Sequence, residues 1–285
     1  MKVTISDISY QYVKRKKKTL NNIHMEINTG VFGLLGENGA GKTTLLKLIA
    51  TLLPLQNGTI AYDSYKWGED EESIRKKIGF LPQKMEFFSH LTSYEFLYYI
   101  CLNKKMVESE IKTQIEYWLE KFNLFDKKNE KISSLSGGMK QRIGIIQALI
   151  GDPEIIILDE PTVGLDPIER LRFKNIISEI SRNKLIIIST HIISDISVLC
   201  NEIGLMKSGE LLFCGSTEQL IQEVNGKIAL KYIAFDEEIP NELLDKIISV
   251  NRIDNQLELR YISDNSTDHF CTPNLEDAFF YKTRL

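Results

Sequence analysis

Three short apolar runs along the chain have the pattern of strands buried on both faces. They lie at residues 31–35, 155–158 and 185–188, and no charged residue interrupts them. Uninterrupted runs of this length are typical of parallel strands that helices cover on both sides. After the first run and a glycine-rich turn, leucines recur at helical spacing over residues 42–52. The pattern predicts an α/β fold in which strand, tight loop and helix follow one another.

Helical patterns replace strand patterns between about residues 86 and 150. Residues 108–122 place several apolar side chains on one helical face, namely Ile111, Ile115, Trp118, Leu119 and Phe122. We expect a helical subdomain here, inserted into a sheet domain that spans residues 1–224.

The pattern changes again after Val224. Strand-like segments at residues 227–234 and 256–262 flank residues 241–250, which have a helical pattern. These elements predict a small α+β extension over residues 225–285.

The composition narrows the class of protein. Hydrophobic residues make up 43% of the 285 positions, which is enough for a packed core. The 35 basic and 39 acidic residues leave a net charge of −4, so we expect no nucleic acid partner. Four dispersed cysteines form neither a zinc pattern nor a disulfide framework, which favours a reducing compartment. The sequence contains no secretory signal and no membrane span, so any membrane role requires a partner chain.

A glycine-rich loop follows the first apolar run. Residues 36–44 match the pattern G-x-x-x-x-G-K-[ST] and stand between a predicted strand and a predicted helix, as that pattern requires. The glycines let backbone N–H groups turn toward phosphate oxygens, and the N-terminal end of the helix attracts the same charge. Lys42 is expected to reach the β- and γ-phosphates of a nucleotide, and the Thr43 hydroxyl to ligate Mg²⁺, although the loop alone does not separate a transporter ATPase from a kinase or a GTPase. The predicted phosphate-binding residues are Gly36, Asn38, Gly39, Ala40, Gly41, Lys42, Thr43 and Thr44.

Two adjacent carboxylates end the second apolar run. Asp159 and Glu160 lie where a buried strand leaves the sheet, at the edge where α/β folds bind ligands. Asp159 is expected to hold Mg²⁺, and Glu160 to act as general base toward the attacking water.

Two further polar residues follow predicted strands. His191 comes after the third apolar run and is a candidate contact of the γ-phosphate and the attacking water. Gln83 is a candidate Mg²⁺ ligand and relay. Taken alone, a histidine at a strand end or a glutamine after a proline is usually structural, so the neighbouring motifs carry both assignments.

A segment before the two carboxylates separates the classes of nucleotide enzyme. Residues 135–142 read Leu-Ser-Gly-Gly-Met-Lys-Gln-Arg, and residues 161–167 read Pro-Thr-Val-Gly-Leu-Asp-Pro. With the phosphate loop, the Gln83 loop, the carboxylates and the histidine, in this order, they resemble the ABC ATPase family over about residues 1–224. Met139 stands where the family's signature usually has glutamine. The resemblance implies an α/β fold of the P-loop NTPase (ABC ATPase) type and Mg²⁺-dependent hydrolysis of ATP.

The resemblance also implies that two cassettes pair. In this family two cassettes dimerise head to tail, so Ser136, Gly137 and Gly138 would bind the γ-phosphate held by the other subunit's phosphate loop. Asp166 would lie at the seam between the subunits. Tyr12 would stack on the adenine, although a tyrosine there can also pack on the first sheet. Such a site works either with another copy of this chain or with a related cassette.

Residues 272–280 indicate which kind of ABC transporter the chain could serve. Residues 272–280 resemble the Pro-Ser-Leu-Glu-Asp-x-Phe ending of bacterial drug, antibiotic and bacteriocin exporter cassettes, with Asn274 as a departure. The same apolar residues can instead pack a terminal helix on the extension. The resemblance implies an exporter motor at the cytoplasmic face of the cell membrane, bound to a separate transmembrane permease.

Two alternatives remain. The first is a non-transport ABC ATPase acting on ribosomes or chromosomes. A single phosphate loop and the absence of sustained heptads disfavour it. The second is a small-molecule kinase, which would leave residues 135–139 without an explanation.

Overall fold

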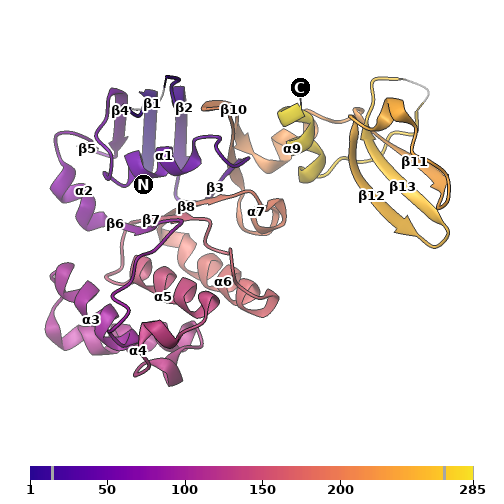
Figure 1. Ribbon diagram of the computed structural model, residues 1–285. Helices are drawn as coiled ribbons and strands as arrows, with labels where there is room; N and C mark the ends of the chain where they lie inside the picture. The colour runs from indigo at the N-terminus through magenta and orange to yellow at the C-terminus, as the bar shows by residue number, and fades with distance from the viewer. Residues whose placement is uncertain (14–15, 266–267, 285) are drawn as a thin grey trace. The chain divides into compact units, whose positions relative to one another are not determined.

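The computed structural model describes residues 1–13, 16–265 and 268–284 (Figure 1). They form two compact units, Met1–Cys214 and Gly215–Leu285. The division follows Cys214, before the boundary after Val224 that we expected from the sequence, so helix α8 (Thr217–Gln222) belongs to the second unit.

A six-stranded sheet runs through the first unit. Its strands, in spatial order, are β10 (Glu210–Ser216), β9 (Glu202–Lys207), β3 (Gly30–Gly36), β8 (Leu185–Thr190), β7 (Ile155–Asp159) and β6 (Ile78–Leu81). The strands from β9 to β6 pair in parallel. The three apolar runs form β3, β7 and β8, and this confirms the predicted α/β class.

The wholly apolar sequence of β7 follows from the two cores on either side of the sheet. Ile155 and Ile157 pack into one core, while Ile156 and Leu158 pack into the other. Successive side chains of a strand point to opposite faces, so a sheet that is covered on both faces needs apolar residues at every position.

An antiparallel sheet and one helix build the first of these cores. The strands of this sheet, in spatial order, are β2 (Leu20–Asn28), β1 (Lys2–Tyr10), β4 (Asn57–Tyr62) and β5 (Tyr65–Lys66). Helix α1 (Lys42–Ile49) contributes Leu45, Leu46, Leu48 and Ile49 to the same core. The leucines recognised at helical spacing therefore anchor the helix that follows the phosphate loop.

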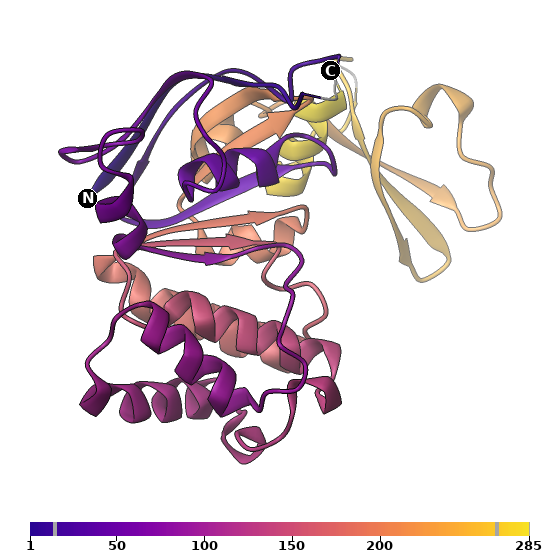
Figure 2. The same cartoon turned by 60° about the vertical axis from the view of Figure 1, so that its left-hand side comes forward.

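Helices cover the opposite face of the six-stranded sheet (Figure 1, Figure 2). They are α3 (Ser93–Asn103), α4 (Glu108–Lys121), α5 (Gly137–Leu149) and α6 (Pro167–Ile180). Helices α3, α4 and α5 occupy the segment in which the sequence predicts a helical subdomain. Shorter helices flank the sheet, α2 (Glu71–Lys77) before β6 and α7 (Ile193–Leu199) after β8.

The parallel arrangement brings three loops to one edge of the sheet. Strands β3, β8 and β7 are adjacent; β8 and β7 end in polar residues, and β3 ends at the glycine that opens the phosphate loop. The loops that follow them begin at Gly36, Thr190 and Asp159, respectively. This edge is where an open α/β sheet binds its ligands.

The second unit contains a three-stranded antiparallel sheet. Its spatial order is β11 (Ile228–Ala234), β13 (Gln256–Ile262) and β12 (Ile247–Ile253). Helix α8 precedes this sheet and helix α9 (Leu275–Arg284) follows it. The strand-like segments predicted at residues 227–234 and 256–262 correspond to β11 and β13.

The helix predicted over residues 241–250 is wrong. Only the short 3₁₀ helix Asn241–Leu243 forms there, a turn follows it, and β12 begins at Ile247. Strands β12 and β13 make a hairpin whose two connecting residues are Asp254 and Asn255, with φ +50° at Asp254. Asp and Asn tolerate this left-handed conformation, which tight hairpins require, and this turn signal outweighs the apolar spacing before it.

Among the described residues, no helix is both long and apolar enough to span a bilayer.

Candidate functional site

A cavity of about 380 Å³ opens beside the phosphate loop in the first unit. Its lining residues are Tyr12, Thr19, Glu37, Asn38, Gly39, Ala40, Gly41, Lys42, Thr43, Thr44, Gln83 and Glu160. The cavity therefore gathers residues that the sequence analysis singled out from four separate segments of the chain.

The backbone of the phosphate loop turns sharply before helix α1. Gly39 and Gly41 have φ of +87° and +105°, values that favour glycine. A Cβ atom at Gly41 would lie 2.8 Å from Leu20 Cδ2, so the close approach of β2 also requires a glycine there. Gly41 caps α1 without any side-chain hydrogen bond to the first turn. The first N–H groups of the helix are thus available to an anion.

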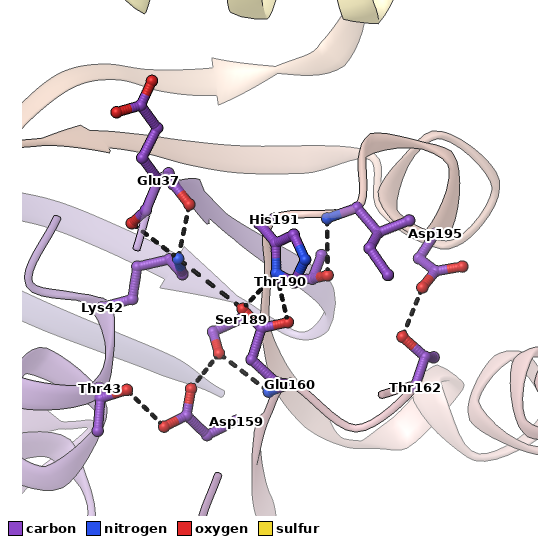
Figure 3. Close-up of polar contacts among 12 residues, drawn as sticks. Glu37, Lys42, Thr43, Asp159, Glu160, Thr162, Ser189, Thr190, His191 and Asp195 are labelled. Carbon is purple, nitrogen blue, oxygen red and sulfur yellow. Dashed lines mark hydrogen bonds and ion pairs between the residues drawn. The ribbon is translucent and has the colours of Figure 1, made fainter. Parts of the chain in front are cut away.

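Lys42 lies inside this loop and is 6% exposed. Its Nζ donates to Gly36 O at 2.6 Å and to Glu37 O at 3.2 Å (Figure 3). Burial lowers the pKa of Lys42, while the nearby carboxylates of Glu160 and Asp159 act to raise it. These two carbonyls hold the ammonium group at the edge of the cavity, where it can form an ion pair with a phosphate.

Asp159 joins the phosphate loop to strand β8. The Thr43 hydroxyl donates to Asp159 Oδ2 at 2.7 Å, and the Ser189 hydroxyl donates to Asp159 Oδ1 (Figure 3). Asp159 is 1% exposed, and these two hydroxyls satisfy both of its oxygens. Ser189 was not predicted as a site residue, although its position at the end of a buried strand was a usable signal.

The donor set around Asp159 fits Mg²⁺. No group of three or more His, Cys, Asp and Glu side chains suited to a metal occurs in the part of the chain that the structure describes. Mg²⁺ does not need such a group, because it usually takes one or two carboxylates, phosphate oxygens and water. The Asp159 carboxylate and the Thr43 hydroxyl already face each other, and Gln83 lines the same cavity. All three supply the oxygen ligands that this ion prefers.

Glu160 also lines the cavity and lies beside the Lys42 ammonium group. Its carboxylate is 3% exposed and lies 3.9 Å from Lys42 Nζ. His191 Nδ1 is 3.0 and 3.1 Å from the two carboxylate oxygens of Glu160 (Figure 3). Glu160 has φ +53°, an uncommon conformation for a residue with a side chain. This strained conformation occurs at the proposed reacting carboxylate, as functional residues often show.

Tyr12 lines the cavity and Tyr10 does not. The Tyr12 hydroxyl lies 3.3 Å from Thr44 Oγ1, whereas Tyr10 is buried in the first core. The two rings pack edge to face with centroids 5.0 Å apart. Of the two tyrosines, Tyr12 is therefore the one that lies beside the phosphate loop.

The signature segment does not line this cavity. Ser136 caps helix α5 and accepts a hydrogen bond from Met139 N at 3.3 Å. A Cβ atom at Gly138 would lie 2.8 Å from Gly164 O, so the segment packs closely on the loop that leads to Asp166. Asp166 in turn caps α6, accepting from Glu169 N at 2.9 Å. The structure therefore brings Gly138 close to the Asp166 loop, away from the cavity that Lys42 lines.

One residue of the signature segment contacts the loop that follows strand β7, and the sequence analysis did not predict this contact. Gln141 Nε2 donates to Glu160 O at 3.3 Å and to Pro161 O at 3.1 Å. The motif match offered no signal for this contact, because it depends on how helix α5 packs against a loop 19 residues away.

The sequence of the chain is similar to a family of transporter proteins. The family model described as ABC transporter matches residues 20–163. The ABC transporter ATP-binding protein NatA of Bacillus subtilis is 35% identical over 225 residues, which cover 77% of this chain and 92% of that protein. The linearmycin resistance ATP-binding protein LnrL of the same organism is 34% identical over 213 residues, which cover 74% of this chain and 68% of that protein.

Solved structures share the fold. An ATP-binding subunit of an ABC transporter has a TM-score of 0.72 at 24% identity, over 78% of this chain and 93% of that one. The dimeric structure of the bacterial ABC transporter cassette MJ0796 has a TM-score of 0.69 at 25% identity, over 75% and 98% of the two chains. A dimeric MJ0796 structure in a post-hydrolysis state, bound to ADP and Pi, has a TM-score of 0.67 at 26% identity, over the same shares.

Proposed function

The chain belongs to the ABC transporter family of ATP-binding proteins, and from this premise we propose that it binds and hydrolyses Mg²⁺-ATP to power a separate membrane permease. The family and the shared fold confirm the resemblance that the order of motifs indicates. The observation that carries the proposal is the buried Glu160 carboxylate, which faces both Lys42 and His191 above the phosphate loop.

Nucleotide binding rests on the phosphate loop. The amides at the start of α1 and the Lys42 ammonium group together neutralise the β- and γ-phosphates. Tyr12, near Thr44, offers its ring to the adenine. When bound, Mg²⁺ supplies positive charge that offsets the charge developing on the transferred phosphoryl group. Thr43, Gln83 and Asp159 are the residues that would hold it.

Hydrolysis requires a base beside the γ-phosphate. Glu160 accepts the proton of the attacking water, since its carboxylate lies at the cavity and is excluded from bulk solvent. His191 orients that carboxylate by donating Nδ1–H to it, and Nε2 can donate to the γ-phosphate when both ring nitrogens carry a proton.

A second cassette completes the site. Ser136, Gly137 and Gly138 form the start of a helix but lie outside the cavity of their own chain. Such a helix start is an anion site, so it suits the γ-phosphate held by another cassette, and Asp166 lies in the loop beside it. The dimeric MJ0796 structures support this pairing, and the second cassette is another copy of this chain or a related one.

Export is the direction that we propose. The relative LnrL is named for antibiotic resistance, and residues 272–280 resemble the ending of exporter cassettes. The motor would work at the cytoplasmic face of the membrane, attached through the permease.

The test compares two lysines of helix α1. Lys42→Met removes the ammonium group from the cavity, so Mg²⁺-dependent ATP turnover should fall by at least about 100-fold. Lys47→Met is the matched control, because Lys47 lies on the same helix outside the cavity, and its turnover should stay near that of the unaltered chain. The proposal fails if the unaltered chain does not hydrolyse ATP, or if both variants hydrolyse it equally.

A further inference from the structure

Gln141 connects the signature helix to the catalytic loop of the same chain. It lies on helix α5, which Ser136 caps, and its side chain is partly buried. The amide nitrogen Nε2 donates to the carbonyls of Glu160 and Pro161, two consecutive residues. One side chain thus fixes two successive carbonyl oxygens directly after strand β7.

The backbone of Glu160 needs such support. Its φ of +53° places it in the left-handed region, which is strained for a residue with a side chain and persists only when its surroundings enforce it. On one side, Glu160 N donates to Ser189 O at 3.1 Å and to Ser189 Oγ at 3.2 Å. On the other side, Gln141 holds the Glu160 carbonyl. Both peptide groups of the strained residue are therefore tied to other elements.

The direction of the Glu160 carboxylate follows from this backbone conformation. If the peptide groups relax to an ordinary conformation, the Cβ atom turns away, and the carboxylate leaves His191 and Lys42. A displacement of about 1 Å at a reacting group can cost on the order of 100-fold in rate.

We propose that Gln141 is a positioning residue for hydrolysis: it holds Glu160 in the left-handed conformation that aims the carboxylate at the cavity. Because Gln141 belongs to the signature helix, a shift of that helix moves the two carbonyls after β7. When a second cassette engages the signature segment, the shift of α5 is therefore transmitted to Glu160 of the same chain through the Gln141 side chain. The inference rests on the proposed role of Glu160 as general base.

The same helix supplies a matched control. Gln147 also lies on α5 and also donates Nε2 to a backbone carbonyl, that of Phe80, at 3.0 Å. Phe80 belongs to strand β6 and does not line the cavity. The same substitutions remove two hydrogen bonds to carbonyls at position 141 and one at position 147, and only those at position 141 bear on Glu160.

The experiment measures kcat and KM for Gln141→Glu and Gln141→Met beside Gln147→Glu and Gln147→Met. At position 141 both substitutions should lower kcat by about 10- to 100-fold and leave KM for ATP nearly unchanged, because the phosphate loop is untouched. At position 147 kcat should stay near the unaltered value. If Gln141→Glu fails to fold, Gln141→Met, which is uncharged and of similar size, carries the test alone.

A pH profile separates positioning from loss of packing. In Gln141→Glu the carboxylate faces two carbonyl oxygens, and this contact raises the pKa of the new group. Its protonated form can donate one hydrogen bond, so kcat relative to the unaltered chain should recover as the pH falls, whereas Gln141→Met should show no such recovery. The inference is overturned if kcat of both Gln141 variants stays near normal, or if the Gln147 variants lose as much. Failure of the proposed function would appear differently, as an unaltered chain without turnover.

Discussion

The carboxylate of Glu160 is almost completely buried and has two polar neighbours. His191 contacts both of its oxygens, and the Lys42 ammonium group lies 3.9 Å away. A buried charge is tolerated where partners compensate for the lost hydration. At the residue scale, the site is therefore a compact set of one carboxylate, one ammonium group and one imidazole.

The contact between His191 and Glu160 leads to a prediction for catalysis. His191→Ala removes the group that orients the carboxylate, so kcat should fall by about 100- to 10,000-fold, while ATP binding to the phosphate loop should persist. Steady-state turnover and binding of a fluorescent ATP analogue measure the two effects separately. His24→Ala, at an exposed position on β2, is the control and should change neither. Turnover of His191→Ala near the unaltered rate would remove His191 from the mechanism.

Most of the cavity could be predicted from the sequence. Asp159, Glu160 and His191 follow buried strands, and parallel adjacent strands bring their carboxyl ends together, so the pattern alone places these residues at one edge. Ser189 and Gln141 were not predicted as members of the site. Their contacts depend on strand register and helix packing, which connect positions that the sequence pattern does not relate.

At the scale of elements, helix α9 is fixed by one buried ion pair. Arg260, on β13, donates to both oxygens of Asp277, with Nε at 2.6 Å and Nη2 at 2.5 Å. Asp277 also accepts from Asn274 N at 2.7 Å, and Asn274 Oδ1 accepts from Asp277 N at 3.0 Å. These reciprocal bonds cap the start of the helix. The ending that resembles exporter cassettes thus has a structural role in attaching α9 to the sheet.

Removing this carboxylate should loosen the second unit. Asp277→Ala leaves the partly buried Arg260 guanidinium without its carboxylate partner, so the free energy of unfolding of this unit should fall by about 1–3 kcal/mol. Hydrogen–deuterium exchange of peptides from β13 and α9 reports on this unit alone and should become much faster. Glu276→Ala, at the neighbouring exposed position, should cost less than about 1 kcal/mol. Unchanged exchange in Asp277→Ala would show that the ion pair does not hold the helix.

The elements of the first unit were easier to predict than those of the second. In the first, short uninterrupted apolar runs and repeating leucines correspond to buried strands and a buried helix face. In the second, β12 is exposed over Val250–Ile253 and carries a mixed pattern that also fits a helix. Its conformation is set by pairing with β13 through the tight Asp254–Asn255 turn, a local signal that apolar spacing does not include.

At the scale of the whole molecule, one chain carries two half-sites that do not meet. The phosphate loop and Glu160 line one cavity, whereas Ser136 and Gly138 lie at the start of α5 outside it. Bound ATP would join the phosphate loop of one cassette to the signature segment of another. Hydrolysis would then remove the charge that joins them and let the pair open toward the permease.

The most direct measurement is ATP turnover together with particle mass for Glu160→Gln at saturating Mg²⁺-ATP. The substitution keeps the shape of the side chain but removes the base, so turnover should fall by about 100- to 10,000-fold and a dimer should accumulate with ATP. Adding Lys42→Met should abolish that dimer, because the second cassette would have no bound γ-phosphate to engage. A mass that stays that of one cassette would exclude self-pairing and point to a related partner. Turnover of Glu160→Gln at the unaltered rate would contradict the central claim that Glu160 activates the attacking water.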